Sequence, residues 1–257
     1  MTDSEKAQYN TVAVEYKAYD DLPMAKLEAQ LIRTALGDCK GFKILDLGGG
    51  TGTHARQAVD LGAEAVDVVD VATEMMQIGK DIEAQMGREG KIRWHTADAG
   101  KPMAEQGVNL PFADYDLVMA NWVFDHAHTM EDLRGMWKNI TGALKPGGKF
   151  LGIRVIQPGI FSEHVKVGTY GARYEDIDVI PGGLKCKVIL MTNPPFSFGG
   201  TMMEDSYGML NEVPKGMGMT DFKAVPAEEM GVVKSDPAFW QTHLAEPLFA
   251  VVTARKV

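Results

Sequence analysis

The chain has 257 residues, of which 45% are hydrophobic and 24% charged, which is typical of a globular protein with a sizeable core. Its net charge of -9 argues against unaided binding to nucleic acid or to an anionic membrane, because both require dense Lys and Arg. The polar N-terminal residues and the lack of a long apolar run predict a cytoplasmic protein with no secretion signal and no membrane span.

Residues 1–40 are predicted to form two helices, the second beginning near Asp21 with Pro23 in its first turn. From residue 41 to residue 156, short β-type runs alternate with helical stretches. The runs are residues 42–47, 65–71, 91–96, 115–120 and 149–156. They recur at intervals of roughly 25 to 30 residues, the length of one strand, one helix and two turns. This alternation predicts an α/β fold with a mostly parallel sheet and helices on both faces.

Two helix starts are indicated by capping residues. Thr73 is a predicted N-cap, with Glu74 near the positive end of the helix dipole. Thr129, with Asp132 three residues later, makes an acidic variant of the capping box. The helix that follows should end before the turn at residues 146–148, which leads into the fifth strand.

Residues 157–221 depart from this alternation and are rich in Gly, Pro, Met and aromatic residues, among them Phe196 and Phe198. A plain α/β unit needs only one helix at this point, so we expect an insertion with short strands at residues 184–191 and 197–203. Its Met and aromatic side chains suit an apolar acceptor pocket, and they suit a packed insertion equally well.

Residues 222–257 are predicted to close the sheet with strands at residues 222–226 and 248–255. No linker divides the chain, so residues 1–257 are expected to form one domain. Cys39 and Cys186 lie far apart and fit no disulfide framework or metal-ligand spacing, which predicts two buried thiols.

A glycine-rich turn follows the first predicted strand and contains Gly48, Gly50 and Gly52. Glycines permit a tight turn and let a ligand lie against the backbone, and the next helix offers N–H groups at its start. The last half of the turn, residues 50–55, also fits a dinucleotide-binding pattern. Asp46 favours another ligand, because its negative charge would repel a diphosphate, whereas it would attract a cationic ammonium group.

Asp70 ends the second predicted strand, 24 residues after Asp46. A carboxylate at this position can accept both hydroxyls of a ribose, in a nucleoside or in NAD. Asp46 is therefore the residue that distinguishes the two kinds of ligand.

Residues 42–156 resemble the class I S-adenosylmethionine-dependent methyltransferases, in particular those that act on small molecules. Five segments match the family's motifs in order: residues 46–52, 68–76, 96–99, 115–121 and 144–150. The resemblance implies a Rossmann-like, seven-stranded, mostly parallel sheet with a final antiparallel strand. It also implies S-adenosylmethionine as cofactor, S-adenosylhomocysteine as product, and a helical lid formed by residues 1–40.

The resemblance further implies which residues hold the cofactor. Asp70 would hold the ribose, Met75 would lie near the adenine, and Asp98 and Ala99 would bind the adenine amino group and ring nitrogen. The remaining cofactor residues are expected to be Tyr16 of the lid, Asp46, Gly48, Gly50, Gly52, Val71 and Asn121. For Tyr16, and for Tyr9 as its alternative, ordinary packing of an amphipathic helix remains the other interpretation.

His126 follows the fourth strand, where many small-molecule members of the family place a histidine facing the transfer site. We predict it as the catalytic base, because an imidazole titrates near neutral pH; the alternative is a surface or helix-capping histidine. His128 is a second candidate and lies nearer the helix start at Thr129. Asp125 and the two histidines also suggest a metal cluster, but no third distant ligand can be named, so no metal is predicted.

The sequence thus predicts methyl transfer to O, N or S of a small, largely apolar metabolite, by a monomer or homodimer without nucleic-acid or membrane partners. Two alternatives stay open. One is a protein of the same fold that binds the cofactor without transferring a methyl group. The other is an NAD(P)-dependent oxidoreductase.

Overall fold

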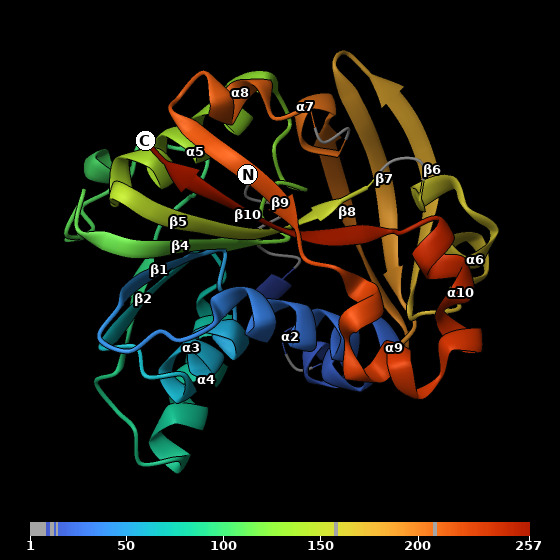
Figure 1. Cartoon of the computed structure of the whole chain (residues 1–257), viewed down its shortest axis with the longest axis horizontal. Helices are drawn as coiled ribbons and strands as arrows, with labels where there is room; N and C mark the ends of the chain where they lie inside the picture. Colours follow the sequence, from blue (N-terminus) through green and yellow to red (C-terminus); the bar gives the residue numbers. More distant parts are fainter. Residues whose placement is uncertain (1–8, 11–12, 14, 157–158, 208–209) are drawn as a thin grey trace.

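A seven-stranded sheet in the order β3-β2-β1-β4-β5-β10-β9 forms the centre of the computed structural model, which describes residues 9–10, 13, 15–156, 159–207 and 210–257 (Figure 1). Its strands are β1 (Lys43–Leu47), β2 (Ala65–Asp70), β3 (Ile92–Thr96), β4 (Tyr115–Asn121), β5 (Leu144–Val155), β9 (Met219–Ala224) and β10 (Phe249–Lys256). Strands β1 to β5 are parallel, and β10 runs antiparallel to both β5 and β9. The predicted mostly parallel sheet with a final antiparallel strand is confirmed.

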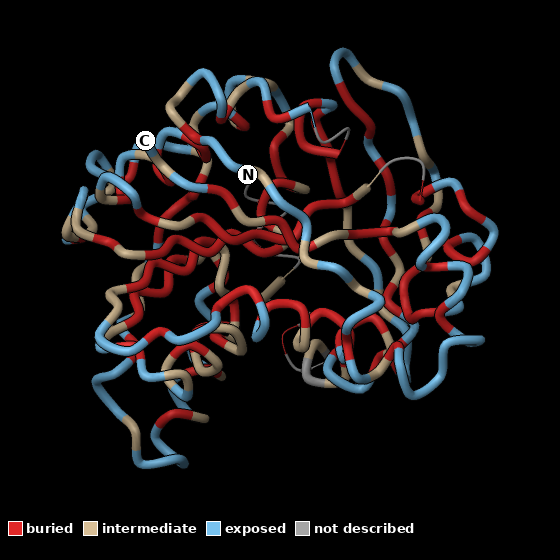
Figure 2. Tube along the Cα trace, in the orientation of Figure 1, coloured by how far each residue is buried: buried red, intermediate tan, exposed pale blue. Residues whose placement is uncertain are grey.

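Helices cover both faces of this sheet, as the alternation of runs predicted. Helices α2 (Pro23–Leu36), α3 (Thr53–Asp60) and α4 (Thr73–Gln85) lie on one face, and α5 (Met130–Ala143) and α8 (Glu212–Lys215) lie on the other (Figure 1). The central strands are therefore covered on both sides, and most of their residues are buried (Figure 2). This double burial explains why β1 and β4 carry apolar residues on both faces, with Asp46 and Asn121 as buried polar exceptions.

Of the two predicted helix caps, one is correct and one is wrong. Thr129 and Asp132 form a reciprocal capping box, in which Thr129 Oγ1 accepts from the Asp132 N–H over 3.1 Å. Helix α4 begins one residue earlier than expected, with Ala72 as N-cap and no side-chain cap on its first turn. Asp70 Oδ1 instead accepts the Ala72 N–H over 2.8 Å, so the last residue of β2 stabilises this turn.

The region from residue 159 to residue 207 contains an antiparallel sheet of β6 (Ala172–Ile180), β7 (Gly183–Leu190) and β8 (Phe196–Met203). Strands β7 and β8 were expected; β6 was missed because its second half carries acidic, exposed residues. Strand β8 contacts the loop after β4, where the Thr201 N–H donates to the Asp125 carbonyl over 2.7 Å. The small sheet therefore lies against the edge of the main sheet at which the parallel strands end.

The boundaries of β5 and β9 also differ from the prediction. Strand β5 starts at Leu144 because this residue pairs with Tyr115 before the left-handed turn at Gly147. Strand β9 starts at Met219 because that residue pairs with Lys256 near the end of β10.

The N-terminal region contains a 3₁₀ helix, η1 (Glu15–Asp21), directly before α2. The first of the two expected N-terminal helices falls largely outside the described residues. The remaining elements are η2 (Met103–Glu105), η3 (Gly159–Phe161), α6 (Glu163–Val167), α7 (Glu204–Tyr207), η4 (Ala227–Glu229), α9 (Gly231–Ser235) and α10 (Pro237–Ala245). Cys39 and Cys186 are both buried free thiols, as predicted. In the described part of the chain, no helix combines the length and apolarity needed to cross a membrane.

Candidate active site

A cavity of about 210 Å³ lies at the carboxyl ends of β1, β2 and β4. Eleven of the residues predicted from the sequence line it: Tyr16, Asp46, Gly48, Gly50, Asp70, Val71, Met75, Asp98, Ala99, Asn121 and His126. Gly52 is the exception. It has a φ of 77°, and a Cβ there would lie 2.6 Å from the Trp94 ring, so Gly52 permits the turn and its packing without lining the cavity.

Two adjacent strands place unpartnered polar groups in this cavity. Asp46 of β1 is 1% exposed, and within the described structure neither of its carboxylate oxygens has a hydrogen-bond partner. The amide oxygen and nitrogen of Asn121, at the end of the neighbouring β4, are likewise buried without a partner there. Buried polar groups are normally satisfied, so this pair fits the ammonium and carboxylate groups of an amino-acid ligand.

Burial also sets the protonation of Asp46. Removal from water raises the pKa of this carboxyl group to about 7, while the neighbouring His54 acts in the opposite direction. A cationic group bound beside Asp46 would favour the ionised carboxylate.

The glycine turn brings the backbone close to the ligand position. Gly48 has a φ of 68°, and a Cβ on it would lie 3.0 Å from Val123 Cγ2. The Gly50 N–H donates to Asp70 Oδ2 over 2.8 Å, which joins the turn to the end of β2. A side chain on Gly48 would crowd Val123 and one on Gly50 would crowd Met75, and both positions have the positive φ that favours glycine.

The ends of β2 and β3 form the end of the cavity at which the sequence predicts the adenosine. The Gly50 N–H donates to Asp70 Oδ2 and the Ala72 N–H to Oδ1, and a backbone hydrogen bond from Val71 also reaches this carboxylate, so the backbone fixes its orientation at the cavity. Asp98 and Ala99 follow β3 and line the same cavity as Met75 of α4.

At the other end of the cavity, His126 is 7% exposed and its Nε2 lies 2.9 Å from the Tyr9 hydroxyl. The two rings meet edge to face with their centroids 5.4 Å apart. The interpretation of His126 as a surface residue is therefore wrong, and the helix cap is supplied by Thr129 instead. Burial raises the pKa of Tyr9 well above its ordinary value, so its hydroxyl stays protonated at neutral pH.

Aromatic rings surround this histidine end. Tyr9 contacts Phe198 of β8 with ring centroids 5.3 Å apart, and Tyr16 contacts Phe196 at 5.7 Å. Tyr16 also stacks on Tyr19 of η1 at 5.3 Å. The N-terminal segment and the small sheet thus form a shared apolar wall beside the predicted transfer site.

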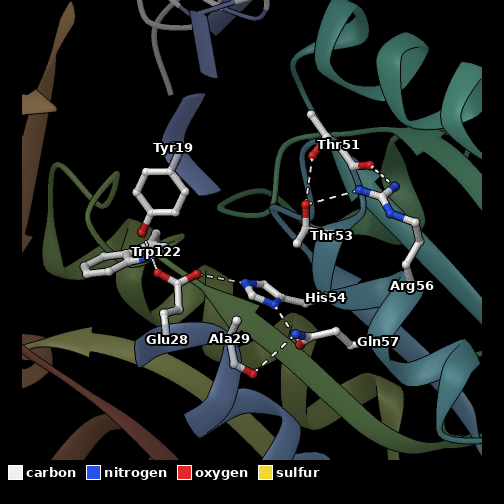
Figure 3. Close-up of polar contacts among 9 residues, drawn as sticks. All are labelled: Tyr19, Glu28, Ala29, Thr51, Thr53, His54, Arg56, Gln57 and Trp122. Atoms are coloured by element: carbon white, nitrogen blue, oxygen red, sulfur yellow. Dashed lines mark hydrogen bonds and ion pairs between the residues drawn. The ribbon is translucent and has the colours of Figure 1, made fainter. Parts of the chain in front are cut away.

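Sequence reasoning missed several polar residues that line the cavity, and three of them, Glu28, His54 and Trp122, form one hydrogen-bonded cluster (Figure 3). Glu28 Oε2 accepts from the Tyr19 hydroxyl over 2.5 Å and from the Trp122 indole N–H over 2.9 Å. Glu28 Oε1 lies 2.8 Å from His54 Nε2. These partners lie outside the immediate sequence neighbourhood of Glu28, so no short sequence pattern predicts the three contacts.

Asp125, His126 and His128 had been considered as ligands of a metal ion, for which a further ligand from a distant part of the chain would be needed. Among the described residues, no group of three or more His, Cys, Asp and Glu side chains is arranged to hold a metal ion. Burial raises the pKa of Asp125 to about 7, and the nearby Arg154 opposes this shift.

Residues 44–148 match a family described as a methyltransferase domain. Over 172 residues the chain is 29% identical to the ubiquinone/menaquinone biosynthesis C-methyltransferase UbiE of Ectopseudomonas mendocina. This match covers 62% of each protein, so the chain spans 62% of the length of this curated relative.

Two solved structures have a similar fold. The CcbJ methyltransferase from Streptomyces caelestis superposes with a TM-score of 0.65 at 16% identity, over 97% of this chain and 96% of that one. Phosphoethanolamine N-methyltransferase 2 of Haemonchus contortus, solved in complex with S-adenosyl-L-methionine, gives a TM-score of 0.60 at 17% identity. That likeness covers 100% of this chain and 60% of the other. At these identities both likenesses establish the fold.

Proposed function

We propose that this chain, whose residues 44–148 match a methyltransferase domain, is a class I S-adenosylmethionine-dependent methyltransferase that methylates a small, largely apolar molecule. The observation that carries the proposal is the buried, unpartnered carboxylate of Asp46 beside the glycine turn. A dinucleotide diphosphate at this turn would meet a negative charge, whereas an amino-acid ammonium group would neutralise it.

The chain's own residues supply binding and orientation. Asp46 and Asn121 would hold the amino-acid end of the cofactor, Asp70 its ribose hydroxyls, and Asp98 with Ala99 its adenine. S-Adenosylmethionine, when bound, supplies a methyl group already activated on a sulfonium. Positioning of the acceptor therefore does much of the catalytic work.

We propose that the acceptor binds against Tyr9 and Tyr16, which line the cavity and are supported by ring contacts with Phe198 and Phe196. The tyrosine rings offer flat surfaces, which suit an acceptor that is itself flat and largely apolar. The acceptor atom remains a prediction: O, N and S stay candidates, and the name of the C-methyltransferase relative adds carbon to them.

We propose His126 as the base for an acceptor that must lose a proton at or before methyl transfer. Support comes from its burial at the acceptor end of the cavity and from its contact with the Tyr9 hydroxyl. In the tautomer that suits a base, the Tyr9 hydroxyl oxygen accepts from the His126 Nε2–H and orients the ring, so that Nδ1 is the nitrogen that takes the proton.

Incubation of the full chain with a methyl-tritiated donor and a library of small aromatic and aliphatic metabolites tests this function. We expect label to move to an apolar acceptor, with release of S-adenosylhomocysteine. Tight donor binding with no transfer to any member of the library would favour the alternative, a protein of this fold that binds the cofactor without transferring a methyl group.

A further inference from the structure

The buried polar cluster around Glu28 joins three separate parts of the cavity wall (Figure 3). Glu28 lies on α2 and is 2% exposed. Its hydrogen-bond donors are Tyr19 of η1, the Trp122 indole after β4, and His54 at the start of α3. One carboxylate therefore fixes the N-terminal segment, the tip of β4 and the helix that follows the glycine turn.

Burying the Glu28 carboxylate removes it from water, which costs free energy of folding. A packed hydrophobic side chain at such a position often stabilises a fold as well or better. Glu28 offsets that cost only because all three of its donors are in place.

Trp122 provides a second, independent observation. Its backbone has a φ of 59°, a left-handed conformation that bulky residues rarely adopt. Asn121, the residue directly before it, has an amide that lines the cavity and is unpartnered in the described structure. The indole hydrogen bond to Glu28 holds Trp122 in this conformation and so fixes the direction of the Asn121 side chain.

His54 extends the effect to the other polar wall. Burial lowers the pKa of His54, but the hydrogen bond to Glu28 and the charges of Glu28 and Asp46 outweigh it, so the net pKa is raised. Gln57, the neighbour on the same helix, lies 3.3 Å from the other ring nitrogen and completes the orientation of the imidazole. His54 in turn favours the ionised form of Asp46.

We propose that Glu28 is a positioning residue for the methyl donor: by binding Trp122, His54 and Tyr19 together, it shapes the pocket that holds the amino-acid end of S-adenosylmethionine. This inference rests on the proposed function, because it assigns the donor to this cavity. Glu28 touches neither reacting group; it acts through Asn121 and Asp46.

The test is the variant Glu28→Gln, which keeps the size of the side chain and removes its charge. Calorimetric titration of the full chain with S-adenosylhomocysteine should give binding about tenfold weaker than in the wild type. In steady-state assays the KM for S-adenosylmethionine should rise by about the same factor, while kcat at saturating donor changes less than about threefold. A residue with only a structural role would not produce this split.

Gln30→Ala is the matched control on the same helix. Gln30 Oε1 accepts the Val232 N–H over 3.1 Å and does not line the cavity, so this variant should bind S-adenosylhomocysteine as the wild type does. If Glu28→Gln does not fold, Tyr19→Phe and Trp122→Phe each remove one donor to Glu28 and should each weaken binding about threefold.

The possible results distinguish a failure of the proposed function from a failure of the proposed role of Glu28. A wild-type chain that binds no S-adenosylhomocysteine overturns the proposed function and this inference with it. A wild-type chain that binds it, with unchanged affinity in Glu28→Gln or in both single-donor variants, overturns the inference alone.

Discussion

The two ends of the cavity are built in different ways. The proposed donor side consists of residues 46–52, Asp70 and Asp98, which lie at the ends of consecutive parallel strands and use backbone N–H groups as well as side chains. The proposed acceptor side consists of Tyr9 and His126, with Phe198 and Phe196 packed behind; these residues come from three distant parts of the chain and meet through ring contacts. The donor side is thus a local feature of a shared fold, whereas the acceptor side depends on the long-range packing of this particular chain.

This difference predicts that changes on the acceptor side alter turnover and substrate choice, whereas changes on the donor side alter cofactor affinity. A substitution that changes both turnover and cofactor affinity would argue against this division of the cavity. A substitution that changes only one of the two would support it.

The largest effect is expected for His126→Ala. If His126 removes a proton from the acceptor, kcat should fall about 100-fold or more, because general bases contribute roughly 10²–10⁴. The affinity for S-adenosylhomocysteine, measured by calorimetry, should change little. His128→Ala is the control on the same loop, and a fall in kcat of less than about tenfold for His126→Ala would remove His126 as the main base.

Next comes Asp46→Asn, for which we expect donor affinity to fall about 10- to 100-fold, because a buried charge no longer meets the ammonium group. The free energy of unfolding should stay the same or increase, since the carboxylate has no partner to lose among the described residues. Thermal unfolding without ligand, together with calorimetry, measures both quantities.

Asp67→Asn is the matched control on the adjacent strand. Asp67 is equally buried but accepts from Arg93, His95 and Tyr115 at 2.5, 2.7 and 2.8 Å. This substitution should destabilise the fold and leave donor affinity unchanged. If both variants lose donor affinity equally, the special role of Asp46 is wrong.

The pH dependence of donor binding should be smaller, about tenfold per pH unit below neutrality. Burial raises the pKa of Asp46 to about 7, so in the free protein this carboxyl is increasingly protonated as the pH falls below that value. An ammonium group binds the ionised form, so binding releases a proton and weakens as the pH falls. Calorimetry between about pH 6 and about pH 8 should show this slope in the wild type and not in Asp46→Asn. A flat wild-type profile would contradict the assignment.

The smallest effect is expected for Phe198→Leu, which keeps an apolar residue but removes the ring that contacts Tyr9. The KM for the acceptor should rise a few-fold, because the loss of one aromatic contact weakens binding by about that factor, and donor affinity should stay unchanged. Steady-state kinetics at fixed, saturating donor measure this. A change in donor affinity equal to the change in acceptor KM would mean that Phe198 does not belong to the acceptor side alone.

The proposed donor side could be predicted from the sequence because Asp46 and Asp70 stand near the carboxyl ends of two predicted strands. Asp98 was expected only from the resemblance to the family, and the structure brings all three residues to one cavity. Gly52 was predicted to contact the cofactor, but its side of the turn packs on Trp94.

The acceptor side and the Glu28 cluster could be predicted only in part. Phe196 and Phe198 stood out as aromatic, but nothing local indicated that they would pack against Tyr16 and Tyr9, which line the cavity. Glu28 and Trp122 lie 94 residues apart, and their hydrogen bond follows from the packing of α2 beneath the end of β4. Such pairs leave no periodic pattern in the sequence.

Calorimetric titration of the wild-type chain with S-adenosylhomocysteine and, separately, with NADH tests the central claim most directly. The arrangement of Asp46, Asp70 and Asp98 predicts one S-adenosylhomocysteine bound per chain and no heat of binding with NADH. Tight binding of NADH without a response to S-adenosylhomocysteine would contradict it, because Asp46 would then be tolerated beside a diphosphate.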